Sequence, residues 1–163
     1  MTLNPQQRAA VRNETVVAVV INAVIITALL WLAGIAPPAA LRGADGLLGG
    51  MAKGAGIPTL LMTLIATKVI RGRVRATPAL ALPWADLPAP LRALPGNLVL
   101  RAVAMALVAI VALVAVGAVV ATLLGIVPLD GRGFVIFNIV FGAVVGLATA
   151  PIVVLRALAD GRA

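Results

Sequence analysis

Few side chains in this sequence of 163 residues can act as an acid, a base, a nucleophile or a metal ligand. The chain has no His and no Cys, and it has five Asp and Glu residues in all. This composition excludes disulfides, cysteine nucleophiles, His-containing triads and metal sites built from His or Cys. No phosphate-binding glycine loop, G-x-S-x-G elbow or H-E-x-x-H pair occurs either. We therefore predict no catalytic, cofactor-binding or metal-binding residues, no cofactor, and a protein that is not an enzyme.

Lys53 is the charged residue that lies well inside a long apolar run. An ionisable residue at membrane depth is a candidate for function by default. Asn138 follows Asp130 by eight residues, just as Lys53 follows Asp45 by eight in the first half of the chain. Asn22 is a further polar residue within an apolar run. One interpretation is a site in which Lys53, Asn138 and Asn22 hold an anionic or carbonyl-bearing ligand. The interpretation we favour is that Lys53 extends its ammonium to the headgroups and Asn138 forms an interhelical hydrogen bond.

Four apolar runs must position these side chains. They cover residues 15–36, 46–70, 98–127 and 134–155, and each can cross a hydrocarbon core of about 30 Å as a helix. The chain is 63% hydrophobic and 11% charged, with a mean hydropathy of +1.16, so it has more apolar surface than a core of this size can bury. We predict an all-α integral membrane protein in which residues 1–163 form a single domain, a compact bundle of four transmembrane helices.

The basic residues are distributed unevenly around these runs. Ten of the 13 Lys and Arg residues flank the two termini and the connection over residues 72–96, whereas Arg42, Lys53 and Arg132 lie on the other side. The positive-inside rule then places both termini in the cytoplasm. We predict a multi-pass protein of a cell membrane, the bacterial inner membrane, whose partners are the lipid bilayer and other membrane proteins or further copies of itself. Nucleic acid is not an expected partner, because the chain lacks a basic face with aromatic residues.

The predicted cytoplasmic connection, residues 72–96, contains five prolines, which disfavour a helix and are typical of an extended, polyproline-like backbone. One interpretation is a ligand for a domain that binds proline-rich segments. The interpretation we favour is a loop that lies on the headgroups with Trp84 as its interfacial anchor. Basic residues gather just before and at the start of this connection, which fits the topology, and binding of acidic headgroups is the alternative. They are Lys68, Arg71, Arg73 and Arg75.

Small residues recur at steps of four in the second and fourth runs. A glycine-rich stripe of this kind lets two helices approach closely in lipid, and threonine hydroxyls can bond across to a neighbour or back to their own helix. The residues predicted to pack against other helices are Gly142, Gly146, Ala150, Thr59, Thr63 and Thr67.

The two halves of the chain share short sequence patterns. A Gly-Ile-x-Pro sequence closes the first and third runs, at residues 34–37 and 125–128, and an Asp-Gly pair precedes the second and fourth, at 45–46 and 130–131. These matches favour a duplicated two-helix hairpin. Chance similarity is the alternative in a chain so rich in Ala, Val and Leu.

For the function, we predict a small polytopic membrane protein that acts as an accessory or scaffold through helix packing. The predicted spans contain no Asp or Glu, the groups from which ion and proton relays are built, and Glu14 precedes the first span. The alternative is a small oligomeric transporter or ligand-binding protein with a polar site near Lys53 and Asn138. An interruption of the second helix at its glycines and Pro58 would favour that alternative, whereas we favour a kinked, closely packed helix.

Overall fold

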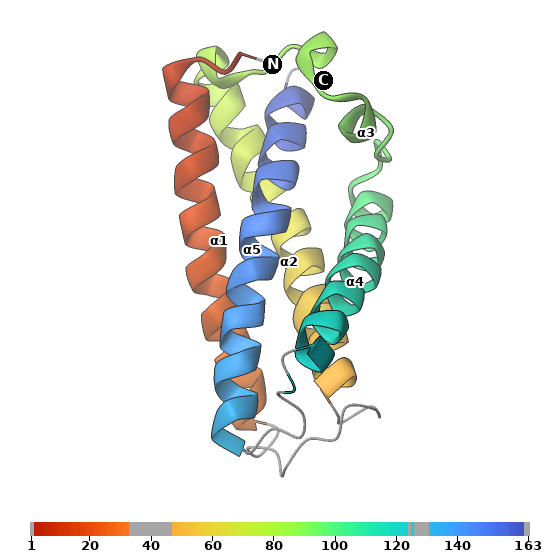
Figure 1. Ribbon diagram of the computed structural model, residues 1–163. Helices are drawn as coiled ribbons and strands as arrows, with labels where there is room; N and C mark the ends of the chain where they lie inside the picture. The colour runs from red at the N-terminus through yellow and green to blue at the C-terminus, as the bar shows by residue number, and fades with distance from the viewer. Residues whose placement is uncertain (1, 33–46, 124, 126–130, 162–163) are drawn as a thin grey trace.

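The computed structural model describes residues 2–32, 47–123, 125 and 131–161. Four long helices, α1 (Pro5–Leu32), α2 (Leu47–Ala76), α4 (Leu98–Leu123) and α5 (Gly131–Asp160), form a bundle. Between α2 and α4 lie two 3-10 turns, η1 (Pro78–Leu80) and η2 (Trp84–Asp86), and the short helix α3 (Ala89–Arg92). Helix α1 begins and α5 ends at the same end of the bundle (Figure 1), which we call the terminal end; the opposite end is the far end.

All four long helices are long and apolar enough to cross a membrane. The spanning segments are Pro5–Ala28, Leu48–Ala76, Leu98–Leu123 and Arg132–Asp160. A helix satisfies its own backbone hydrogen bonds, as a segment in lipid must. The described residues form no strand, so the prediction of an all-α, multi-pass bundle of four transmembrane helices is confirmed.

The helices that pack together are not neighbours in the chain. Helix α5 packs along α1 and α2, and α2 packs along α4, whereas α1 and α2, like α4 and α5, contact each other only slightly. The order across the bundle is therefore α1, α5, α2, α4 (Figure 1). If α1 is exchanged with α4, and α2 with α5, the pattern of contacts stays the same: the α1–α5 contact becomes the α4–α2 contact, and the α2–α5 contact is unchanged. The pattern is the one that a duplication would produce, although neither half packs as a closed hairpin, and the duplication stays a prediction.

Helix α1 begins at Pro5, well before residue 15, where we expected the first span to start. Its start is a reciprocal cap: Gln7 N–H donates to Asn4 Oδ1 at 2.8 Å, and Asn4 N–H donates to Gln7 Oε1 at 3.0 Å. Pro5 occupies the first helical position, where a missing N–H costs nothing. The charge-free run from residue 15 gives the part of the helix that is apolar enough for the lipid interior, whereas the helix itself also includes the mostly polar residues 5–14.

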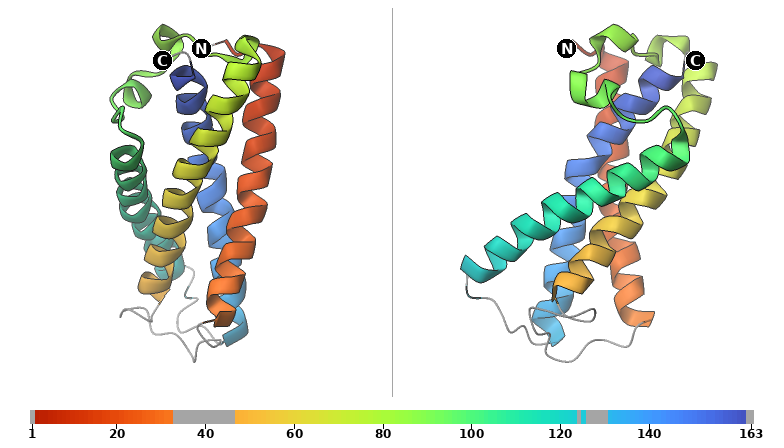
Figure 2. Two further views of the ribbon diagram at one scale, coloured as in Figure 1. Left: turned by 180° about the vertical axis from the view of Figure 1, so that it is seen from behind. Right: turned by 90° about the vertical axis from the view of Figure 1, so that its right-hand side faces the viewer.

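The proline-rich connection does not adopt the extended backbone that we expected. Residues 77–96, which we call the terminal cap, fold into η1, η2 and α3 across the terminal end of the bundle (Figures 1 and 2). Pro78 opens η1 and Pro88 directly precedes α3, positions at which the fixed backbone angle of proline favours a turn. Leu82 and Leu87 are buried in a core with residues of α2 and α5. Burial of these side chains holds the cap against the bundle, so the expectation of an extended backbone was wrong, whereas a position of the segment at the headgroups, with Trp84 as anchor, stays a prediction.

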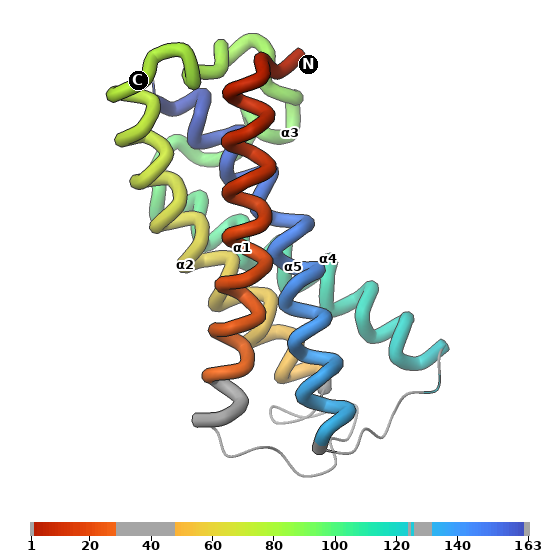
Figure 3. The backbone as a smooth tube through the Cα atoms, turned by 90° about the vertical axis from the view of Figure 1, so that its left-hand side faces the viewer, coloured from red at the N-terminus to blue at the C-terminus, as the bar shows by residue number. Residues whose placement is uncertain are grey.

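Helix α2 is continuous from Leu47 to Ala76, so the interruption that would favour a transporter does not occur. Proline is tolerated within a transmembrane helix when neighbouring helices support the backbone. Such neighbours lie close on both sides: a Cβ at Gly56 would lie 2.8 Å from Ile110 Cδ1 of α4, and one at Gly54 would lie 3.5 Å from Ile26 Cδ1 of α1. Gly54 and Gly56 therefore allow neighbouring helices to pack closely against α2. Helix α4 crosses the bundle obliquely (Figures 2 and 3), and near the far end Gly117 of α4 lies against Met51 of α2 and Phe141 of α5.

Candidate functional site

The carboxylate of Asp160 binds arginines from three helices at the terminal end. Arg71 Nη2 of α2 donates to Asp160 Oδ2 at 2.7 Å, and Arg101 Nη1 of α4 donates to the same oxygen at 2.5 Å. Arg156 Nη1 of α5 donates to the other oxygen, Oδ1. We call these four residues the arginine cluster. Charge-assisted hydrogen bonds of this kind are about twice as strong as neutral ones.

Local helix geometry brings each member of the arginine cluster into place. Asp160 is the last residue of α5, and Arg156 precedes it by one turn, a spacing that puts two side chains on the same helix face. Arg101 lies in the first turn of α4, which Asn97 caps by accepting the N–H groups of Val99 and Leu100. Arg71 lies in the part of α2 that extends past the predicted span end at residue 70. The three helix ends therefore converge on one carboxylate.

The terminal cap covers this site. The guanidinium carbon of Arg156 lies 4.2 Å from the centroid of the Trp84 ring, within the range of a cation–π interaction. Leu82 N–H donates to the carbonyl of Leu158 at 3.1 Å, which satisfies a backbone group that the end of α5 leaves open. On the other side, Gln7 Nε2 of α1 donates to Ala81 O at 2.9 Å. The cap thus links the start of α1 to the end of α5 and shields Arg156 from water.

The arginine cluster is buried and carries more positive than negative charge. The side chains of Arg101, Arg156 and Asp160 are 2%, 3% and 8% exposed, and that of Arg71 is 31% exposed. One carboxylate balances one of three guanidinium charges, so two positive charges lack a counter-charge within the cluster. Burial of a charge is costly unless it is paired and hydrogen-bonded. Three buried donors have no hydrogen-bond partner in the described part of the chain: Arg71 Nε, Arg101 Nη2 and Arg156 Nε.

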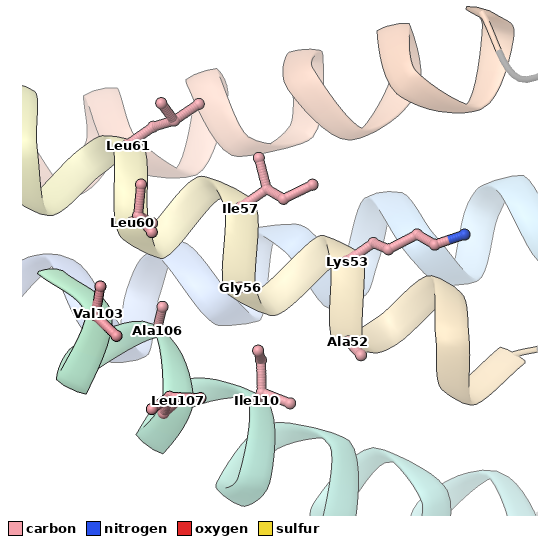
Figure 4. A pocket seen from close by; sticks show the side chains of 10 residues that line it. All are labelled: Ala52, Lys53, Gly56, Ile57, Leu60, Leu61, Val103, Ala106, Leu107 and Ile110. Carbon is pink, nitrogen blue, oxygen red and sulfur yellow. The ribbon is translucent and has the colours of Figure 1, made fainter. Parts of the chain in front are cut away.

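Within the described residues, Lys53, Asn138 and Asn22 do not line one common pocket. Lys53 is exposed and lines a groove between α2 and α4, where its ammonium extends toward the far end, as that of a snorkelling lysine would (Figure 4). Asn138 is buried on α5 and does not line this groove; its side-chain amide donates to Phe134 O of the same helix at 2.8 Å, so the expected donation to another helix was wrong. Asn22 is buried on α1 next to Gly146. The three polar residues therefore occupy separate places in the bundle.

Gly142 and Gly146 lie against α1, on the face of α5 where the small-residue stripe predicts a neighbour. A Cβ at Gly146 would lie 3.0 Å from the Cα of Val19 and 3.1 Å from Asn22 Nδ2, and a Cβ at Gly142 would lie 2.2 Å from Ile26 Cδ1. At Gly146 the backbones of the two helices approach so closely that a larger residue has no room.

The other predicted packing residues are buried between the helices. Thr63 Oγ1 donates to the carbonyl of Thr59 at 2.7 Å, the usual way in which a helical threonine satisfies its hydroxyl. Thr59 Oγ1 and Thr67 Oγ1 are buried and have no hydrogen-bond partner among the described residues, and Ala150 is fully buried.

From the sequence, Arg101 and Arg156 entered only the count of basic residues that sets the topology, Arg71 belonged to a group with binding of acidic headgroups as its alternative role, and Asp160 was not singled out. One signal was available: Arg156 and Asp160 are four residues apart at the end of a predicted span, a spacing that suits an ion pair on a helix. The partners from α2 and α4 lie 89 and 59 residues away from Asp160, and no local pattern predicts these contacts.

The arginine cluster has the chemistry of recognition and not of acid–base catalysis. Arginine keeps its proton and offers five N–H donors in a fixed plane, so it binds oxyanions and does not transfer protons. Among the described residues, no group of three or more acidic side chains lies close enough together to hold a metal ion. The chain matches no family model, no curated protein and no solved structure.

Proposed function

We propose that this chain is an accessory or scaffold protein of the membrane, without enzymatic activity, that binds a transmembrane helix of another membrane protein between α2 and α4. The observation that supports this proposal is the groove between these helices (Figure 4). It has a volume of about 490 Å³, room for side chains of an approaching helix, and apart from Lys53 its lining is aliphatic or glycine. Ala52, Gly56 and Ala106 are small, and small residues allow helices to approach closely in lipid.

The position of α4 supports the same role. Helix α4 packs along α2 but only slightly against α5, and apolar side chains such as Leu107, Val108 and Val111 are exposed on it. In lipid, apolar surface alone does not drive association, because the acyl chains are equally apolar. Helices gain free energy where shapes fit closely, and a groove with small residues at its base offers such a fit.

The proposed orientation places both termini and the terminal cap in the cytoplasm, in the inner membrane of a bacterium. The basic residues support it: ten of the 13 Lys and Arg residues lie in or next to the termini and the terminal cap. Positive loops are retained on the cytoplasmic side during insertion. The partner helix then meets α2 and α4 within the bilayer, between the terminal end and the far end.

Photo-crosslinking within the membrane tests the proposed role. A photoreactive residue is placed at Leu61 or Leu107, which line the groove, and at Val20 or Val24, which are exposed on α1. The groove positions are expected to give discrete adducts with one membrane protein, and the α1 positions adducts with lipid. Ile57→Trp fills the groove and should abolish the protein adducts while the helix content stays unchanged. Lipid adducts alone at all four positions would overturn the proposal, and adducts with a second copy of the chain would make the partner the chain itself.

A transporter is the second candidate function, favoured by buried polar atoms that have no partner inside the bundle. They are Asn22 Nδ2, Thr59 Oγ1 and Thr67 Oγ1, as far as the described residues show. An unpaired polar atom in an apolar interior is costly, and a hydrated path or a bound ligand would satisfy it.

Water accessibility separates the two candidates, and the absence of native cysteine makes the measurement clean. Thr63→Cys places a thiol in the bundle interior, at a buried position of α2. A scaffold predicts no reaction with a membrane-impermeant thiol reagent from either side of the membrane, as for Ala55→Cys on the same buried face. A transporter predicts labelling of Thr63→Cys, and that result would replace the scaffold proposal.

A further inference from the structure

We propose that Arg71, Arg101 and Arg156 bind a phosphate-type oxyanion at the terminal end of the bundle, with Asp160 holding the three guanidinium groups in place. This site is separate from the groove between α2 and α4 and does not depend on the proposed function.

The geometry of the arginine cluster gathers donors at one point. Arg71 and Arg101 donate to the same oxygen of Asp160, so their donating nitrogens lie within about 5 Å of each other, and Arg156 binds the second oxygen. Each guanidinium keeps at least one buried N–H group without a partner in the described chain: Arg71 Nε, Arg101 Nη2 and Arg156 Nε. Because buried donors are normally satisfied, three unsatisfied donors on adjacent side chains indicate a missing acceptor.

The charge balance indicates that this acceptor is an anion. Three guanidinium groups surround one carboxylate, and like charges brought together away from water repel strongly. The other acidic residues that the structure describes do not compensate them: Glu14 pairs with Arg73, and Asp86 is exposed on η2 and forms no ion pair. A bound oxyanion supplies the missing negative charge.

The position of the cluster indicates a phosphate group. It lies where three spanning segments end or begin, at the C-terminal turns of α2 and α5 and the first turn of α4, which is the depth of lipid headgroups. The planar fork of arginine matches the paired oxygens of phosphate. Arg71, whose side chain is 31% exposed, is the member through which a ligand enters, because Arg101 and Arg156 are buried. A lipid headgroup and a soluble phosphate share this chemistry.

The test measures thermal unfolding of the purified full chain with inorganic phosphate, and with sulfate or chloride at matched ionic strength. Phosphate is expected to raise the melting temperature more than chloride does, in a saturable manner. Arg71→Gln is expected to weaken phosphate binding at least fivefold, because it removes the accessible donor while Arg101 and Arg156 still bind Asp160. Arg73→Gln is the matched control: this neighbour is 57% exposed, lies outside the cluster and should leave phosphate binding unchanged.

A second readout keeps the test independent of stability. Trp84 stacks on Arg156, so an anion that moves this guanidinium changes the emission of Trp84; Trp31→Phe removes the second tryptophan of the chain. Arg71→Lys keeps the positive charge but lacks the planar guanidinium. This variant replaces Arg71→Gln in the phosphate-binding test if Arg71→Gln does not fold. Equal responses to phosphate and chloride, together with an unchanged response in the Arg71 variants, would overturn the proposal.

Nanodiscs identify the source of the phosphate group. Wild type and Arg71→Gln are compared in phosphatidylcholine and in phosphatidylglycerol. If the ligand is a lipid, phosphatidylglycerol stabilises the wild type more than Arg71→Gln, and added phosphate has little further effect. If it is soluble, added phosphate stabilises the wild type equally in both lipids. No dependence on Arg71 in either lipid, with or without phosphate, would again exclude the site.

Discussion

Arg101 and Asp160 are joined by a hydrogen bond of 2.5 Å between Nη1 and Oδ2, although 59 residues separate them and their helices contact each other only slightly. The bond connects the first turn of α4 to the last residue of α5. Because Arg71 of α2 binds the same oxygen, one carboxylate holds the terminal ends of three helices together. Nearer the far end, apolar packing holds α4 instead: Ala121 of α4 is buried in a core with Met51 of α2 and Phe134 of α5.

Asp160→Asn should destabilise the protein by about 3–5 kcal/mol, because it leaves three buried or partly buried guanidinium groups without their counter-charge. The measurement is the free energy of unfolding in a denaturant titration in mild detergent. Glu14→Gln is the control: its partner Arg73 is mostly exposed, and exposed ion pairs contribute about 0–1 kcal/mol. Equal losses for the two variants would mean that Asp160 does not organise the helix ends.

Gly146→Ala should destabilise the protein by about 1–3 kcal/mol, because the added Cβ would lie 3.0 Å from the Cα of Val19, and two backbones would have to separate. Gly142→Ala should cost less despite its shorter contact of 2.2 Å, because the atom it meets is the terminal carbon of Ile26, which can rotate away. Gly72→Ala, on α2 with nothing within 4 Å, should be neutral or stabilise by up to about 1 kcal/mol. The same unfolding titration ranks the three variants, and Gly146→Ala behaving like Gly72→Ala would contradict the close approach of α1 and α5.

The sequence predicts the four helices because each contains a continuous apolar run, and hydropathy depends only on neighbouring residues. Small residues at every fourth position, among them Gly142 and Gly146, likewise predicted which face of α5 packs against another helix, but not that this helix is α1. Hydropathy does not predict the spatial order α1, α5, α2, α4, in which helices that follow each other in the sequence, such as α1 and α2, contact each other only slightly. For the same reason, the contact of Arg101 with Asp160 depends on tertiary packing and was not predicted.

The terminal cap shows a second limit of local patterns. Its prolines suggested an extended backbone, but Pro78 and Pro88 open helical turns, and the apolar side chains between them decide the outcome. Leu82 and Leu87 bury their side chains beneath the cap, and that burial depends on the ends of α2 and α5. A proline-rich segment with regularly placed leucines can thus fold when a hydrophobic surface lies within reach.

Leu87→Ala should therefore destabilise the protein by about 2–5 kcal/mol, as for a leucine in a packed core. Loss of this contact should also release the cap, so trypsin should cleave after Arg92 faster than in the wild type. Leu100→Ala is the control, since this leucine lies near the same end on an exposed face of α4 and its truncation should change stability by about 0.5 kcal/mol or less. Unchanged cleavage and stability in Leu87→Ala would show that the cap is not held by its leucines.

The orientation in the membrane can be read with single cysteines, because the native chain has none. Ala85→Cys places a thiol on the exposed surface of the terminal cap, and Arg132→Cys places one on an exposed position at the start of α5, at the far end. The excess of basic residues at the terminal end predicts that Ala85→Cys is protected from an impermeant thiol reagent in intact cells and reacts in inverted membrane vesicles. Arg132→Cys should show the reverse pattern. Labelling of Ala85→Cys in intact cells would place the terminal cap outside, and the arginine cluster would then face the opposite leaflet from the one we propose.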